Sequence, residues 1–267
     1  MIQEASEVAL FLNVHLFDPI ARAFGFTPST QHPHALPDHI VMVLLVSLGL
    51  VIFSAWFRRR LSIDNPSNIQ HLIEVAFEAV QGLMRDVIGG KDYARFTPLI
   101  GTLATYILVS NLIGLIPGLI SPTSNLNITA SCAICVFIYY NFQGLRKHGF
   151  LGYMKHFAGP VLWLAPMLFV IEVISHLARP VSLSIRLFGN IFAEELVITS
   201  INNYIFPFLL SLPVMFLALF AGTIQAFIFI LLTMVYLSGA VEEGHDEGHA
   251  EAHDNGPAHA ETQKAAA

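Results

Sequence analysis

The chain contains 267 residues, of which 55% are hydrophobic and 12% are charged, and its mean hydropathy is +0.64. These values exclude an ordinary soluble domain and predict an all-α integral membrane protein, because several apolar runs are long enough to cross a bilayer. The net charge of -6 reflects the C-terminal end, since seven of the nineteen acidic residues lie at or beyond Glu242. Acidic and basic residues balance in the rest of the chain, and no nucleic-acid partner is expected.

Residues 1–37 are predicted to form an extracytoplasmic leader before the first span. The apolar run Val8–Leu12 is short and follows acidic rather than basic residues, so no cleavable signal peptide is expected. The first transmembrane helix is predicted over residues 38–57. It is followed directly by the arginines of Arg58–Arg60, which are typical of a cytoplasmic boundary.

Residues 66–90 predict a different kind of helix. Asn65 is a suitable N-cap and Pro66 a suitable first helical residue, and Gly89 and Gly90 close the segment. Between these ends, apolar and polar residues follow the spacing of an amphipathic helix. Such a helix lies in the membrane interface or packs against a partner.

Two further spans are predicted over residues 96–117 and 127–145, with a turn between them that lacks Lys and Arg. In the first of them, polar side chains at helical spacing either pack helices together or line a path. These side chains are Thr102, Tyr106, Ser110 and Asn111. In the second, we interpret Cys132 and Cys135 as small packing residues, because an apolar helix does not favour a reactive thiolate.

The longest apolar run covers residues 160–206 and would measure about 70 Å as a single helix. Because a bilayer core is only about 30 Å thick, either Pro180 divides the run into two spans or the helix is strongly tilted. A last helix is predicted over residues 213–240, and it carries Gln225 among apolar neighbours.

Charged and polar residues concentrate between Glu172 and Glu195 of the long run. A charge near the middle of a bilayer costs at least about 2 kcal/mol, so such residues usually face a protein interior or a water-filled path. At about 100° per residue, most of them share one face of the helix. This stripe consists of Glu172, Ser175, His176, Arg179, Ser182, Arg186, Asn190 and Glu194. Glu195 lies about 140° away from Glu172 and predicts a second, acidic stripe.

The basic residues predict the orientation of the chain in the membrane. Nine of the thirteen fall in the two segments that follow the first and third predicted spans. The positive-inside rule places these segments in the cytoplasm and therefore the N-terminus outside. If the long run crosses once, the C-terminus is cytoplasmic.

Residues 241–267 form an acidic, histidine-rich tail that is predicted to be disordered. His245, His249 and His253 could bind a transition metal if this segment were helical, although a solvated tail is the simpler interpretation. The histidines do not form the HExxH pattern of zinc proteases, and no metal site is predicted.

The sequence contains no phosphate-binding loop, nucleophile elbow or spaced zinc ligands, so a non-catalytic protein without a cofactor is expected. Arg186 is the residue that most needs an explanation. An arginine does not release its proton in a protein, so it acts as a fixed positive charge rather than a relay. Such a charge attracts a carboxylate and blocks the passage of a cation.

Several stretches of the chain match the pattern of a known family. They are PVSLSIRLFGN at 180–190, EL at 195–196, QAFIF at 225–229, YLS at 236–238 and NLIGLIP at 111–117. Together with the amphipathic helix, they closely resemble subunit a of the bacterial F-type ATP synthase, the membrane stator half of its ion channel. The likeness covers about residues 38–240.

The resemblance implies that Arg186 faces a ring of c subunits and pairs with the ionised carboxylate of each subunit as it passes. It also implies two offset aqueous half-channels through which protons reach and leave that carboxylate. The resemblance and the polar stripes together give the expected proton path: Glu195, Glu194, Gln225, Asn190, Glu172, His176, Asn111 and Ser182.

The resemblance also implies partners, a location and the course of the long run. The partners would be the c-subunit ring, the b-subunit peripheral stalk, the remainder of the ATP synthase and the lipid bilayer. The location would be the bacterial inner membrane. The run over residues 160–206 would be one steeply tilted helix that pairs with the last helix as a hairpin, so that the chain has about five spans.

One position departs from the family pattern. Some members carry a titratable group seven residues before Gln225, where this chain has Ala218, whereas Glu194 adds a second acid beside Glu195. We interpret Glu194 as a substitute for that group, although its helical angle places it on the side of Arg186.

Two other kinds of function are alternative interpretations of the same residues. A secondary transporter or channel could use Arg186 to bind an anion, but it predicts internal repeats and helices broken at the midplane, and no repeat is found. A membrane scaffold would pair Arg179 and Arg186 with Glu172 and Glu194 inside the bundle. For Arg179 this structural role, through Glu172, stands beside a functional one.

Overall fold

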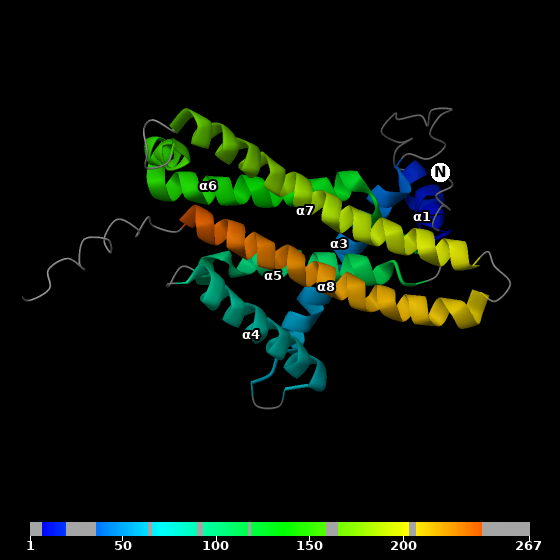
Figure 1. Ribbon diagram of the computed structural model, residues 1–267. Helices are drawn as coiled ribbons and strands as arrows, with labels where there is room; N and C mark the ends of the chain where they lie inside the picture. Colours follow the sequence, from blue (N-terminus) through cyan, green and yellow to red (C-terminus); the bar gives the residue numbers. More distant parts are fainter. Residues whose placement is uncertain are drawn as a thin grey trace, which may run out of the picture.

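The computed structural model describes residues 7–19, 36–63, 66–89, 93–116, 119–158, 165–202 and 207–241. Every regular element within these residues is helical (Figure 1). Five helices are long and apolar enough to cross a membrane, so the predicted all-α polytopic fold is confirmed. The predicted tail beyond Val241, including its histidines, lies outside the described residues.

The N-terminal part of the chain contains a helix that the sequence analysis did not predict. Helix α1 (Glu7–Leu12) continues into a π-helical segment, η1 (Asn13–Phe17). The first long helix, α3 (Asp38–Arg60), starts after Pro37 and ends with three arginines, where cations favour the negative end of the helix dipole.

Helix α4 (Asn68–Ile88) is the amphipathic element, and it begins two residues later than the sequence pattern suggested. Ser67 is its N-cap, because its hydroxyl accepts a hydrogen bond from the backbone N–H of Gln70 at 3.3 Å. The expected cap, Asn65, lies outside the described residues. Gly89 ends the helix with a φ of 69°, a conformation that glycine adopts without strain.

Helices α5 (Tyr93–Ile113) and α6 (Leu126–Ala158) are joined through a short 3-10 turn, η2 (Pro122–Ser124). The turn is buried although it carries two hydroxyl side chains, Thr123 and Ser124. Helix α6 changes direction at Gly149, whose φ is 71°. The turn thus places polar groups inside an apolar bundle.

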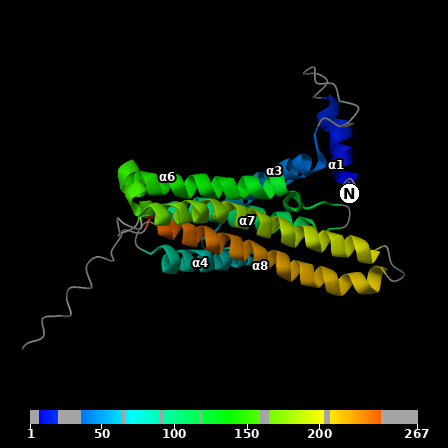
Figure 2. The ribbon, with the colours of Figure 1, turned by 45° about the horizontal axis from the view of Figure 1, so that its top comes forward.

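Helices α7 (Ala165–Asn202) and α8 (Pro207–Val241) form a long hairpin. Pro180 lies inside α7 and does not divide it, so the first of the two alternatives for the long run is wrong. At about 57 Å, α7 is nearly twice as long as a bilayer core is thick. Figure 2 shows α7 between α6 and α8.

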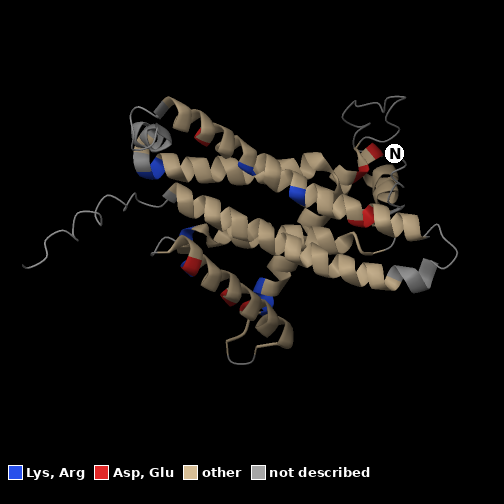
Figure 3. Ribbon diagram, viewed as in Figure 1, with Lys and Arg blue, Asp and Glu red and all other residues tan. Residues whose placement is uncertain are grey.

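One apolar core holds α4 to α8 together. Its fully buried side chains come from all five helices and include Met84, Phe96, Tyr140, Leu187 and Phe229. The charged residues follow a different pattern (Figure 3). Away from the first and last turns of the described spans, they lie on α7, which carries Glu172, Arg179, Arg186, Glu194 and Glu195.

Candidate functional site

Arg186 lies in the middle of α7, and its side chain is exposed on the outside of the bundle. Among the described residues it forms no ion pair and no hydrogen bond through its guanidinium. Leu183 and Leu187, on the neighbouring face of the same helix, are buried in the core and fix the rotation of α7. The fold therefore presents a permanent positive charge at its surface.

The residues one turn to either side of Arg186 belong to the same predicted stripe. Ser182 is exposed and Asn190 is half-buried. Within the described part of the chain, neither side chain forms a hydrogen bond. The central part of the stripe thus lies along an open side of α7 rather than inside the bundle.

Glu195, nine residues after Arg186, contacts a different part of the molecule. Its Oε1 accepts a hydrogen bond from the backbone N–H of Ser121 at 3.2 Å. Ser121 is fully buried, and its hydroxyl lies 2.9 Å from the backbone oxygen of Ser110 at the end of α5. The second acidic position predicted on α7 is therefore held at the turn between α5 and α6.

Asn111 connects the same turn to α8. Its Nδ2 donates to the backbone oxygen of Gly222 at 3.0 Å, and its Oδ1 lies 2.8 Å from the hydroxyl of Thr123. A Cβ at Gly222 would lie 3.4 Å from that of Asn111, at the lower limit of ordinary van der Waals contact, so α5 and α8 lie close together here. We call Ser110, Asn111, Ser121, Thr123 and Glu195 the Glu195 cluster.

The hydroxyls of Ser121 and Thr123 in the Glu195 cluster have three contacts but only two protons. The oxygens of Ser121 and Thr123 lie 2.7 Å apart, and each also faces an acceptor, the backbone oxygen of Ser110 or Oδ1 of Asn111. The bond to Gly222 fixes which amide atom of Asn111 is the oxygen. Because a hydroxyl carries one proton, the pair has two alternative orientations.

Two predicted path residues adjoin this cluster along their helices. Gln225, one turn after Gly222, is 4% exposed, and its Nε2 has no hydrogen-bond partner among the described residues. Glu194 precedes Glu195, and its Oε1 is likewise buried without a partner in the described part of the chain. Buried polar atoms without a protein partner are commonly satisfied by ordered water.

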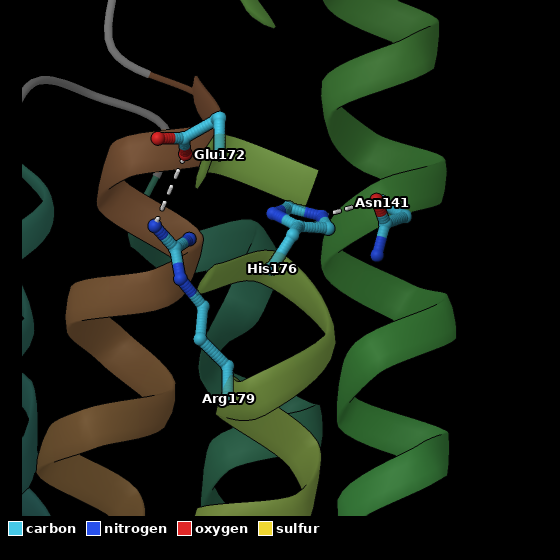
Figure 4. A network of polar contacts seen from close by, with 4 residues as sticks. All are labelled: Asn141, Glu172, His176 and Arg179. Carbon is cyan, nitrogen blue, oxygen red and sulfur yellow. Dashed lines mark hydrogen bonds and ion pairs between the residues drawn. The ribbon is translucent and has the colours of Figure 1, made fainter. Parts of the chain in front are cut away.

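A second group of polar side chains lies on the other side of Arg186 along α7 (Figure 4). Nη2 of Arg179 is 3.7 Å from Oε1 of Glu172, and its Cζ lies 5.3 Å from the ring centroid of Tyr236 on α8. The pair between Arg179 and Glu172 is one of the two ion pairs that are expected if the chain is a membrane scaffold. The described residues form no such pair between Arg186 and Glu194.

His176 in the same group joins α7 to α6. Its Nε2 lies 2.8 Å from Oδ1 of Asn141. Because Nδ2 of Asn141 donates to the backbone oxygen of Phe137 at 2.7 Å, Oδ1 is the acceptor and Nε2 of His176 carries the proton. We call Asn141, Glu172, His176 and Arg179 the His176 cluster.

The two clusters lie on opposite sides of Arg186 along α7. The helical rise places Arg179 about 10 Å and Glu195 about 14 Å from it. The structure therefore places Glu195 and Asn111 in one cluster and Glu172 and His176 in the other. Arg186 belongs to neither cluster. This separation of a fixed charge from two polar clusters is the main geometric feature of the site.

Several members of these clusters were not predicted. The stretch Ser121–Ser124 was assigned to a turn, and its hydroxyl residues gave no signal of burial, since Ser and Thr are mostly exposed in proteins. Asn141, in contrast, gave a signal as a polar residue within the apolar part of α6. No group of potential metal ligands forms within the described residues.

The fold and the site define a polytopic membrane protein whose longest helix carries fixed charges within the membrane region. Comparison with known proteins gives the family. The family described as ATP synthase A chain matches residues 40–238. The chain therefore belongs to the ATP synthase A chain family.

Individual relatives agree with this assignment. ATP synthase subunit a of Citrifermentans bemidjiense is 43% identical over 238 residues, which cover 88% of this chain and 98% of that protein. ATP synthase subunit a of Geotalea uraniireducens is 49% identical over 210 residues, covering 78% of this chain and 89% of the relative. ATP synthase subunit a 1 of Pelobacter propionicus is 46% identical over 208 residues, covering 78% and 89%.

Proposed function

We propose that the chain is the proton-channel stator subunit of the ATP synthase membrane sector, and that Arg186 is its essential fixed charge. Membership of the family supports the general role of a non-catalytic membrane subunit. The observation that carries the finer proposal is the exposed guanidinium of Arg186, which lies between two polar clusters and has no ion-pair partner among the described residues. A charge in this position is stabilised by an acid that another polypeptide supplies.

In this proposal Arg186 pairs in turn with an ionised carboxylate on each subunit of a c ring. The guanidinium cannot give up its proton, so it binds the carboxylate without relaying the proton. A carboxylate leaves Arg186 for the apolar membrane only after it has been neutralised, because an unpaired charge in hydrocarbon is costly. Rotation of the ring away from Arg186 is thereby coupled to proton uptake.

The two clusters would border the two half-channels. The Glu195 cluster, with Glu194 and Gln225, would deliver protons on one side of the membrane, and Glu172 and His176 of the His176 cluster would exchange them on the other. Ser182 and Asn190 would flank the fixed charge. Arg186 prevents a proton from passing directly between the two paths, because it repels cations at the point where they approach each other.

Orientation follows from the basic residues. We propose that the end of α3 lies in the cytoplasm, with the N-terminus outside and the C-terminus inside, and the arginines of Arg58–Arg60 support this orientation. The turn η2 and the Glu195 cluster then lie toward the extracytoplasmic side. Each proton that moves inward across 100 mV releases about 2.3 kcal/mol, so several protons are needed for each ATP.

The proposal includes partners and location. The chain would assemble with the c ring, the b-subunit peripheral stalk and the remainder of the ATP synthase in the bacterial inner membrane. A secondary transporter is the less suitable alternative, because its binding helices are typically broken at the midplane. Here α7 runs through Pro180 without interruption.

The experiment replaces Arg186 with Ala and with Lys in the complete complex. We expect ATP-driven proton pumping in inverted membrane vesicles to fall by about 100-fold in Arg186→Ala, because the ring carboxylate loses its only fixed partner. Recovery of the c ring with the purified complex serves as the control for assembly. Pumping within about twofold of the unmodified complex would exclude the proposed role.

A further inference from the structure

A short apolar helix near the N-terminus plays no part in the function proposed above. Elements α1 and η1 run from Glu7 to Phe17, and residues 8–17 contain no Asp, Glu, Lys or Arg. The apolar stretch Val8–Phe17 measures about 15 Å as a helix, and the charged residue Asp18 follows it. A bilayer core is about 30 Å thick, so this apolar stretch is too short to cross it.

Asn13 fixes the short helix to the beginning of the first span. Its side chain is fully buried, and its Nδ2 lies 3.0 Å from the backbone oxygen of Leu36 and 3.3 Å from Oδ1 of Asp38. Ala9 packs in the same apolar cluster as Val41 of α3. Because Asp38 is the first residue of a membrane-length helix, these contacts hold α1 and η1 at the level of the membrane surface.

The direction of the helix agrees with this position. Figure 2 shows α1 running across the direction of α6, α7 and α8, at the end of the bundle where α3 begins. Since the long helices cross the membrane, a helix that lies across them at their ends runs along the membrane surface rather than through it.

The side of this helix that points away from α3 is apolar and exposed. Phe11 is 61% exposed, and Val8, Leu10, Val14 and Leu16 are exposed as well. The ring of His15 stacks on that of Phe11 at a centroid distance of 4.3 Å. An apolar surface of this kind is unfavourable in water and marks a contact with lipid or with another protein.

We propose that α1 and η1 form an interfacial foot that lies in the boundary between lipid headgroups and acyl chains. Between Val8 and Phe17 only Ala9 and Asn13 are buried, so apolar side chains are exposed around most of the helix. Lipid can cover such a surface completely, whereas a protein partner would cover one side. The neighbouring span exposes Leu44, Leu48 and Val51 to the same bilayer. The foot fixes the depth of α3 in the membrane.

The test uses spin labels on the complete complex in vesicles of phosphatidylethanolamine and phosphatidylglycerol. Labels are attached to Phe11→Cys or Val14→Cys in a complex without other accessible cysteines, including Cys132→Ser and Cys135→Ser. Leu48→Cys is the reference for a lipid-facing site, and Arg59→Cys is the reference for a site in water. Collision with dissolved oxygen and with a water-soluble nickel chelate is measured by electron paramagnetic resonance.

We expect both labels to behave like the label at Leu48, with nickel accessibility at least about threefold below that at Arg59 and with high oxygen accessibility. Nickel accessibility equal to that at Arg59 would place the helix in water and overturn the proposal. Protection from both reagents would show a protein partner instead and would also overturn it.

A second variant tests the attachment. Asn13→Ala removes the hydrogen bonds to Leu36 and Asp38, so the label at Phe11 should become more mobile and more accessible to nickel. An unchanged label would show that Asn13 does not position the foot. If this variant does not assemble, the two labelled positions in the otherwise unmodified chain still decide between lipid, water and protein.

Discussion

The backbone N–H of Ser121 donates a hydrogen bond to Oε1 of Glu195, although the two residues are 74 positions apart in the chain. The contact joins the turn η2 to the predicted acidic stripe of α7. It holds the half-buried carboxyl group of Glu195 against a turn whose three hydroxyl side chains, of Ser121, Thr123 and Ser124, are buried. A backbone donor aimed at a carboxylate stabilises its ionised form without adding a second charge.

Ser121→Pro removes this donor while preserving the local backbone. Ser121 has φ -64° and ψ 128°, which proline adopts readily. A hydrogen bond to a charged group contributes about 1.5–3 kcal/mol, so we expect ATP-driven proton pumping to fall by roughly tenfold or more. The measurement uses inverted vesicles with equal amounts of assembled complex.

Ser121→Ala is the matched control, because it removes the hydroxyl and keeps the N–H. In this variant the hydroxyl of Thr123 loses its contact with the hydroxyl of residue 121 and can still donate to Oδ1 of Asn111. We expect pumping within about threefold of the unmodified complex. Equal rates in the alanine and proline variants would show that the bond to Glu195 does not contribute.

Gly114 allows the turn to approach α5. A Cβ at this position would lie 2.8 Å from the Cβ of Ser121, a distance that real Cβ atoms do not show. Overpacking of this kind costs about 1–3 kcal/mol. Gly114→Ala should therefore displace the turn from Glu195 and lower the temperature at which the purified complex loses pumping.

Gly49→Ala on α3 is the control for this substitution, because nothing lies within 4 Å of its added Cβ. This variant should keep the thermal stability of the unmodified complex. Identical inactivation temperatures for the two alanine variants would contradict the assigned role of Gly114.

Glu194 is the acid that we interpret as a substitute for the group missing at Ala218. Its Oε1 is buried and has no hydrogen-bond partner among the described residues. Glu194→Gln keeps the size of the side chain and removes its ability to take up a proton, so we expect pumping to fall roughly tenfold. Glu78→Gln on the exposed side of α4 should leave the rate unchanged. An unchanged rate in Glu194→Gln would leave the interpretation without support.

Arg179 should differ sharply from Arg186. It is already paired with Glu172 and lies over the ring of Tyr236, so we expect its role to be structural. Exposed ion pairs and cation–π contacts each contribute up to about 1 kcal/mol. Arg179→Ala should lower the stability of the complex slightly and keep pumping within about threefold of normal. Complete loss of pumping in an intact complex would show instead that Arg179 acts in translocation.

The membrane helices could be predicted from the sequence because their signal is local. Apolar length locates the spans, and the arginines after α3 mark its end. The course of α7 was not decided by local pattern, since Pro180 is compatible with a break and with a continuous membrane helix. Packing against α6 and α8 decides it in favour of continuity. The helix at Glu7–Phe17 was missed because its apolar run is short.

The candidate site could be predicted only in part, for a similar reason. Helical periodicity shows which side chains share a face of α7, and Arg186 follows from the cost of an intramembrane charge. Periodicity does not show which distant segment meets that face. Ser121 reaches Glu195 through a turn, and Asn141 reaches His176 from another helix, 35 positions away.

The central claim is that Arg186 meets a carboxylate from another polypeptide. Electron cryo-microscopy of the complete complex, purified with this chain, measures that contact directly. We predict the guanidinium of Arg186 within about 4 Å of a carboxylate on an adjacent subunit, with no acid of its own chain at that distance. A guanidinium paired with Glu194 of its own chain, or surrounded by lipid with no subunit opposite, would contradict the account.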